Sequence, residues 1–253
     1  KKTIKNSSYL SGFVGLVFTS FILLTVFLAG EMFPFGEGTV SWCDMNQQII
    51  PLFCDFKDVL SGENSLFLNT QNAGGMNFYG VFFFNLSSPF SFLVALVNKS
   101  QIPYLMNILV ILKLSLCGFT AGFVFHRIFK ENGVLLSAFL GTCYALCGYG
   151  MLFYQNIMWL DMMYLFPIVA LGIFKLIKQN RPAVLLISLT LSVIFNFYIS
   201  FMVYLALILF FGLYALFFRN TDRKIYVNLG LCGVISLTVS AFVWVPCLLQ
   251  YFS

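Results

Sequence analysis

Long apolar runs divide this chain into segments that match the thickness of a lipid bilayer. A helix of about 20 apolar residues spans roughly 30 Å of hydrocarbon, and the runs lack the alternation of a membrane β-strand. The approximate ranges of the seven runs are 9–29, 103–125, 134–153, 157–177, 183–199, 201–218 and 225–249. The pattern predicts an all-α polytopic membrane protein, with residues 1–253 forming a single transmembrane domain of about seven helices.

Two apolar stretches require a decision about how often they cross. Residues 183–218 are too long for one span, and we expect two helices joined by a tight turn at 196–200. Residues 78–97 are also apolar, but they contain Asn85, Pro89 and the serine pair at 87–88. A full crossing there would reverse every later loop, so we expect an interfacial or re-entrant segment.

Composition agrees with this class and excludes others. Apolar residues make up 60% of the chain and charged residues only 9%, whereas soluble domains carry about 25% charged residues. So few charges cannot cover the surface of a cytosolic globular protein. A disordered chain and a nucleic-acid-binding protein are excluded for the same reason.

The charges separate by side when the N-terminus is placed in the cytoplasm, as the excess of basic residues in inner loops requires. Of the 14 basic residues, 11 then lie inside: Lys1, Lys2, Lys5, Arg127, Lys130, Lys175, Lys178, Arg181, Arg219, Arg223 and Lys224. Of the nine acidic residues, seven lie outside: Glu31, Glu37, Asp44, Asp55, Asp58, Glu63 and Asp161. We therefore predict a cytoplasmic N-terminus.

The predicted extracytoplasmic loop between the first two spans, residues 30–102, holds six of the nine carboxylates. A loop of this length either carries a function or serves as a solvated connection. The first span is longer than the apolar core of a cleaved signal peptide, so we expect a retained anchor. Because the sequence lacks an initiator Met and stops just after an apolar run, we expect the N-terminal portion of a longer protein.

Several motifs, in this order along the chain, resemble the bacterial YfhO family of membrane proteins. The most specific is NIMWLD at 156–161, followed by Pro167. The other matches are Trp42-Cys-Asp44 with Gln48 and Pro51, GENSLF at 62–67, Gly75-x-Asn77 with LSSPF at 86–90, and NFYISFM at 196–202. Relatives often read Asp-Leu-Tyr-His-Gln where this chain has Asp44-Met-Asn-Gln-Gln48, which leaves its acceptor preference open.

The resemblance implies a GT-C-type glycosyltransferase with a large first outer loop that contains an essential aspartate. Members of the family are similar to enzymes that use an undecaprenyl-phosphate sugar to decorate cell-envelope polymers such as lipoteichoic acid. The implied location is the bacterial plasma membrane, with the active site on its outer face. The implied partners are a polyprenyl-phosphate-linked sugar, a cell-envelope glycopolymer acceptor and the lipid bilayer.

Such a transfer needs a base for the acceptor hydroxyl. The single histidine, His126, lies at the cytoplasmic end of a span, where a surface or interface histidine is the usual interpretation. Asp44, soon after the first span, is therefore the first catalytic candidate. It could instead hold a divalent cation such as Mg²⁺ or Mn²⁺ near the phosphate, or cap a helix. A monophosphate leaving group does not require a metal.

Asp161 is the second catalytic candidate, because an ionisable side chain in a span is costly and often functional. A capping or structural pairing role is the alternative. Lys113, about ten residues into the second span, could bind the lipid phosphate, pair with Asp44 or Asp161, or snorkel outward as a structural cation. Asp55 and Asp58 share a helix face, where a solvated surface is expected more than a cation site.

Five further residues are candidates for substrate binding. Gln48, Asn77 and Asn156 could bond sugar hydroxyls. Trp42 and Trp159 could stack on a sugar ring, although membrane-interface aromatic belts are the commoner use of tryptophan.

The remaining patterns carry little functional information. Five cysteines lie in predicted spans as small apolar residues, whereas Cys43 and Cys54 share the outer loop and could pair. The sequence contains no zinc-type spacing, phosphate-cradling glycine motif or serine-nucleophile motif. Two other function classes stay open: a lipid-linked-sugar flippase or secondary transporter, for which no convincing internal repeat is present, and a non-catalytic scaffold.

Overall fold

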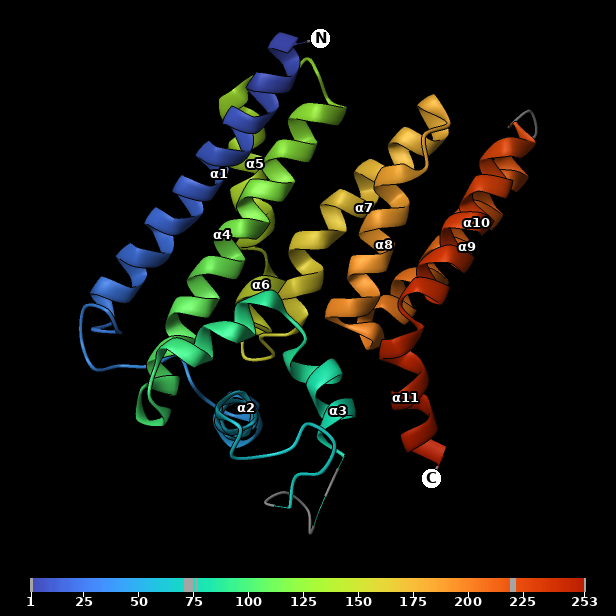
Figure 1. Ribbon diagram of the computed structural model, residues 1–253. Coiled ribbons are helices and arrows are strands. Elements are labelled where there is room, and N and C mark those ends of the chain that lie inside the picture. Colours follow the sequence, from blue (N-terminus) through green and yellow to red (C-terminus); the bar gives the residue numbers. More distant parts are fainter. Residues whose placement is uncertain (1, 71–74, 76, 219–221, 253) are drawn as a thin grey trace.

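The computed structural model describes residues 2–70, 75, 77–218 and 222–252, and these ranges fold into helices joined by mostly short connections (Figure 1). No β-strand is present within them, so the predicted all-α membrane fold is confirmed. In chain order the elements are α1 (Lys2–Ala29), η1 (Met45–Ile49), α2 (Ile50–Ser61), α3 (Phe78–Val81), η2 (Phe82–Leu86), η3 (Pro89–Leu96), η4 (Lys99–Gln101), α4 (Ile102–Ile128), α5 (Val134–Ala145), α6 (Gly148–Leu152), α7 (Trp159–Gln179), α8 (Ala183–Phe195), α9 (Phe197–Phe217), α10 (Arg223–Val239) and α11 (Ala241–Phe252).

The number of membrane spans depends on how two bent helix pairs are counted. Five helical segments in the described ranges are long and apolar enough to cross a bilayer: Asn6–Ala29, Lys99–Ile128, Val134–Leu152, Trp159–Gln179 and Phe197–Phe217. Two pairs qualify only if each is one span, namely α10 with α11, bent by 66°, and 78–86 with 89–96, bent by 105°. The total of five to seven agrees with the prediction of about seven.

Two predicted spans differ in detail from the observed helices. The run at 183–199 corresponds to α8, which has 13 residues and is therefore only about 20 Å long at 1.5 Å per residue. It ends at Asn196, whose extended backbone (φ −162°) separates it from α9. Two antiparallel helices are present as expected (Figure 1), but one residue forms the break. The run at 134–153 is likewise interrupted, between α5 and α6.

Small residues allow α1, α4 and α5 to pack closely side by side. A Cβ atom on Gly118 would overlap the hydroxyl of Thr19, and one on Gly141 would lie 2.6 Å from the carbonyl oxygen of Gly118 and 2.5 Å from the nitrogen of Gly122. Only glycine leaves room for such backbone contact, a common basis of helix association in membranes. These helices therefore form a tight unit from which α4 reaches the site.

The charged residues gather at opposite ends of the helices. Figure 1 shows the N-terminus and the α4–α5 and α7–α8 connections at one end, and the chain between α1 and α4 at the other. The first end carries the basic residues that follow α4, end α7 and begin α10: Arg127, Lys130, Lys175, Lys178, Arg181, Arg223 and Lys224. The basic connections thus share one end, and the side of the membrane that it meets stays a prediction.

Cysteine labelling tests this orientation. In a chain whose native cysteines are replaced by serine, a cysteine introduced at Thr70 should react with a membrane-impermeant thiol reagent applied to intact cells, because we place that loop outside. A cysteine introduced at Asn180, between α7 and α8, should react only after the membrane is permeabilised. The opposite pattern would reverse the topology and move the proposed site to the cytoplasmic face.

The segment between α1 and α4 lies across one end of the long helices. In Figure 1, α2 is seen end-on, so its axis runs across theirs. The chain from α3 to η3 then bends by 105° near Ser87 and Ser88, and it enters and leaves this bend at the same end of the helices (Figure 1). The interfacial or re-entrant course expected for 78–97 stays a prediction, because a bent pair of this kind is either a broken span or a re-entrant loop.

Candidate functional site

A single amide from α4 holds the segment that follows α1. Asn107 is fully buried, with 0% of its surface exposed. Its Oδ1 accepts a hydrogen bond from the backbone nitrogen of Val40 at 2.9 Å, and its Nδ2 donates to the carbonyl oxygens of Phe33 at 3.0 Å and Gly38 at 3.1 Å. Asn107 is not among the site residues predicted from the sequence. The signal that could have found it is its position, because an amide side chain inside a membrane span requires hydrogen-bond partners.

The predicted catalytic Asp44 lies four residues after Val40, at the start of η1. It is exposed, as are Trp42 and Gln48. Asp44 occupies the N-cap position of η1, but its side chain makes no capping hydrogen bond there. Its Oδ1 lies 3.8 Å from the Sγ atom of Cys43, a weak donor. The carboxylate is therefore accessible to a substrate, as a general base must be.

Substituting Asn107 tests whether this amide fixes the segment that bears Asp44. We expect Asn107→Leu to leave the Val40 N–H and the Phe33 carbonyl without their partner, at about 1–3 kcal/mol for each buried group left unmet, while the Gly38 carbonyl keeps its bond from the Phe33 nitrogen. Amide hydrogen exchange in a peptide covering 33–44 should then accelerate at least tenfold. Exchange in a peptide from α8 is the internal reference, and equal protection of 33–44 in both proteins would contradict the assigned role.

Trp42 connects the segment to the loop that precedes α7. Burial raises the pKa of Tyr154, and the nearby indole N–H of Trp42 opposes that rise by favouring the phenolate. The motif that contains Trp42 thus lies next to the loop that leads into the NIMWLD motif, although the two are about 110 residues apart in sequence.

Trp159 belongs to an aromatic cluster at the start of α7. Its ring stacks on that of Tyr149 with centroids 6.5 Å apart, and it lies 5.5 Å from the ring of Phe153. Asn156 is partly buried, and its carbonyl oxygen accepts a hydrogen bond from the nitrogen of Trp159 at 2.7 Å. These contacts explain the local fold of the motif. Sugar binding by Asn156 and Trp159 stays a prediction.

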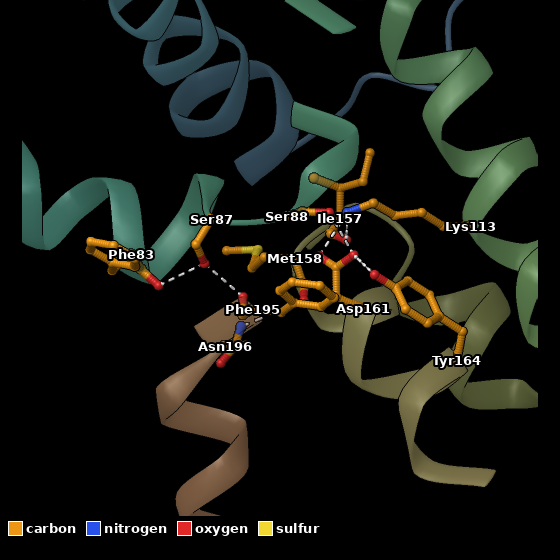
Figure 2. A network of polar contacts seen from close by, with 10 residues as sticks. All are labelled: Phe83, Ser87, Ser88, Lys113, Ile157, Met158, Asp161, Tyr164, Phe195 and Asn196. Carbon is orange, nitrogen blue, oxygen red and sulfur yellow. Dashed lines mark hydrogen bonds and ion pairs between the residues drawn. The ribbon is translucent and has the colours of Figure 1, made fainter. Parts of the chain in front are cut away.

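Lys113 and Asp161 form an ion pair inside the protein (Figure 2). The Lys113 Nζ atom lies 2.8 Å from Asp161 Oδ2, and the two residues are 1% and 0% exposed. Of the three interpretations of Lys113, pairing with Asp161 is the one that the structure shows. The two carboxylates predicted as catalytic candidates are therefore in different surroundings, with Asp44 exposed and Asp161 buried.

Two serines in the bend near residue 87 extend this polar network. Ser88 donates a hydrogen bond from its hydroxyl to Asp161 Oδ1 at 2.8 Å. Ser87 donates to the carbonyl oxygen of Phe195 at 2.9 Å, and the Asn196 amide donates to that of Met158 at 3.5 Å (Figure 2). The bend, the start of α7 and the α8–α9 break therefore join at one network.

An apolar cavity of about 290 Å³ lies beside this network. Its walls come from α5, α6, α7 and α9 and the α5–α6 connection: Tyr144, Cys147, Tyr149, Met162, Met163, Phe166, Ile199 and Val203. The Tyr144 hydroxyl donates to the carbonyl oxygen of Met163 at 2.8 Å, so this polar group is already bonded. The cavity suits hydrocarbon more than a sugar.

The acidic pair on α2 differs from the expected solvated face. Asp55 and Asp58 are 8% and 5% exposed, and Asp58 Oδ1 lies 2.5 Å from the Nζ atom of Lys99 in η4. The interpretation of a solvated face is therefore wrong, because α2 packs this face against other elements of the outer segment. The ion pair fastens α2 to the chain just before α4.

Other candidates lie apart from this arrangement. Asn77 is exposed and caps α3, where its Oδ1 accepts a hydrogen bond from the nitrogen of Tyr79 at 3.0 Å. His126 is buried, 3.2 Å from the hydroxyl of Ser8, which makes it an interface histidine. Cys43 and Cys54 are free thiols.

Asp44 does not belong to a cluster of metal-binding side chains within the described residues. Those residues contain no group of three or more histidine, cysteine, aspartate or glutamate side chains arranged to hold a metal. Magnesium is often held by one or two carboxylates together with substrate phosphates. Asp44 alone fits only that kind of site.

Comparison with known proteins decides the family. Residues 15–253 match the family described as bacterial membrane protein YfhO. This chain belongs to the YfhO family. No curated protein and no solved structure gives a match.

In this YfhO protein the predicted site residues fall into two groups. Trp42, Asp44 and Gln48 lie on the accessible segment after α1, next to the loop that contains Asn156. Lys113 and Asp161 lie buried beneath the bend near residue 87. The YfhO chain is a membrane protein on the strength of both its helices and its family.

Proposed function

We propose that this YfhO protein is a membrane glycosyltransferase of the GT-C type. It would transfer a sugar from a polyprenyl-phosphate donor, such as undecaprenyl phosphate, to a hydroxyl group of a cell-envelope polymer such as lipoteichoic acid, at the outer face of the plasma membrane. The observation that carries the proposal is the accessible Asp44 carboxylate, which lies two residues from Trp42 on a segment whose backbone Asn107 bonds at Val40. Family membership and the helical membrane fold support the same class.

In the proposed reaction, Asp44 accepts the proton of the acceptor hydroxyl while the hydroxyl oxygen forms a bond to the anomeric carbon of the sugar. The bond between that carbon and the phosphate oxygen breaks, and polyprenyl phosphate leaves with the electron pair. We assign Trp42 to packing against the sugar ring. Gln48 and Asn156 are assigned to its hydroxyl groups.

The donor also needs a place for its hydrocarbon chain. The apolar cavity between α6, α7 and α9 supports this requirement, because Tyr149 contributes both to its wall and to the aromatic cluster around Trp159. Asn77, at the start of α3, is further along the same segment, and we keep it as a candidate for bonding sugar hydroxyls.

Reconstitution tests the function. The full-length protein in liposomes, supplied with radiolabelled sugar on polyprenyl phosphate and with a glycerol-phosphate polymer, should yield labelled polymer. Empty liposomes and heat-inactivated protein are the controls. Movement of the lipid-linked sugar between leaflets without labelled polymer would instead support a flippase. If neither labelled polymer nor movement of the lipid-linked sugar is detected, both functions are contradicted.

A further inference from the structure

The bend between η2 and η3 contacts a buried ion pair, Lys113 and Asp161. Ser87 and Ser88, which form the bend, are 7% and 1% exposed. Ser88 bonds directly to the Asp161 carboxylate, and the next aromatic residue, Phe90, has its ring 6.0 Å from the Nζ atom of Lys113 (Figure 2 shows the charged pair). Both partners of the ion pair therefore contact the bent segment.

The ammonium group of Lys113 has few interactions left to make. It donates to Asp161 Oδ2 at 2.8 Å and to the carbonyl oxygen of Ile157 at 3.0 Å, and it faces the ring of Phe90. An ammonium group has three N–H donors. Two of those of Lys113 are in hydrogen bonds, and the Phe90 ring lies near the group. A lipid phosphate would have to displace these contacts in a site that is almost completely buried.

The carboxylate of Asp161 is equally occupied. Oδ2 accepts from Lys113, and Oδ1 accepts from Ser88 at 2.8 Å and from the hydroxyl of Tyr164 at 2.9 Å. The ring of Tyr164 in turn packs edge-to-face with Phe90, with centroids 6.2 Å apart. Two residues of α7 that lie one helical turn apart thus contact the bent segment: Asp161 bonds Ser88, and Tyr164 packs against Phe90.

We infer that Lys113 and Asp161 are positioning residues: their ion pair holds the bend at Ser87 and Ser88 inside the helix bundle, and neither side chain contacts the substrate. The inference goes beyond the proposed function, and only its activity measurement rests on that function. Removing one partner of a buried pair leaves an uncompensated charge, whereas replacing both with apolar side chains of similar volume is often tolerated. A group that acts on the substrate cannot be replaced in that way.

The test compares Lys113→Met, Asp161→Leu and the double variant in the full-length protein. A cysteine placed at Ser91, which is 2% exposed in η3, reports the position of the bend through its rate of alkylation, measured by peptide mass spectrometry. We expect each single variant to raise the rate at least tenfold. We expect the double variant to lower it to several-fold above the parent, because the unpaired charge is gone while the Ser88 bond to Asp161 is also lost, and to recover sugar transfer in parallel.

Two further proteins keep the test decisive if a single variant fails to fold. Ser88→Ala removes one bond to Asp161 and keeps both charges, so we expect alkylation of the cysteine at position 91 to rise several-fold. Glu63→Gln, an exposed acid in the same outer segment, is the matched control and should change nothing.

Three outcomes would overturn the inference. One is unchanged alkylation in Ser88→Ala and in the single variants, and another is a double variant that is no better protected at position 91 than the single variants. The third is a double variant that regains protection but no transfer, because one of the two groups would then act on the substrate. If the parent protein itself shows no transfer, the proposed function fails while the alkylation results still decide the positioning role.

Discussion

Replacing Asp44 by asparagine should lower the rate of sugar transfer by about 10²–10⁴-fold, the usual contribution of a general base. The amide keeps the size of the carboxylate but cannot take the proton of the acceptor hydroxyl at neutral pH. Asp44 makes no capping hydrogen bond, so the fold should survive the change. The measurement is the initial rate of polymer labelling in proteoliposomes, together with the melting temperature of the purified variant.

The matched control for Asp44→Asn is Glu37→Gln. Glu37 is exposed and lies in the same segment, between the residues that Asn107 binds. It loses the same charge without touching the proposed base, so its rate should stay within about twofold of the parent. A parental rate in Asp44→Asn would remove Asp44 from the mechanism, and equal losses in both variants would indicate a general effect of charge.

Gly141→Val should prevent the α1–α4–α5 unit from packing. The added Cβ would approach backbone atoms of Gly118 and Gly122 to 2.6 Å and 2.5 Å, and backbone atoms cannot rotate away as a flexible side chain can. Overpacking of this kind costs typically about 1–3 kcal/mol and occasionally more. We expect most of the variant to elute as aggregate in detergent, measured by size-exclusion chromatography, with a melting temperature lowered by several degrees in the remainder.

Gly212→Val in α9 provides the comparison, because a Cβ there would meet no atom within 4 Å. It carries the same loss of a glycine and the same β-branched side chain in a membrane helix. Gly212→Val should elute as the parent does. If both variants aggregate to the same extent, helix propensity and not close packing would account for the loss.

The fold was largely predictable because the length of an apolar run is a local property of the sequence. The predicted helix bounds were less accurate where an apolar run was interrupted. Asn196 ends α8 after only 13 residues, and the predicted span at 134–153, present as Val134–Leu152, is divided between α5 and α6. Such breaks depend on which neighbour satisfies the freed backbone groups, as the bond from Ser87 to the carbonyl oxygen of Phe195 illustrates.

The site was less predictable, because a polar residue in a span shows that it needs a partner but not which partner it has. Lys113 and Asp161 are 48 positions apart, and Ser88 and Asp161 are 73 apart. Asn107 lay outside the prediction, and the segment that it holds carries the proposed base. Asp55 and Asp58 have the spacing of a solvated helix face, yet the packing of α2 buries both.

The sequence by itself determined that this is a helical membrane protein of the YfhO family, with its basic connections at one end of the helices and a long acidic segment at the other. Hydropathy and charge determine these features because they act through transfer between water and hydrocarbon, residue by residue. The tertiary structure alone decided that Asp161 is buried with Lys113 while Asp44 is accessible. Burial and pairing depend on contacts between segments that the order of the sequence does not bring together.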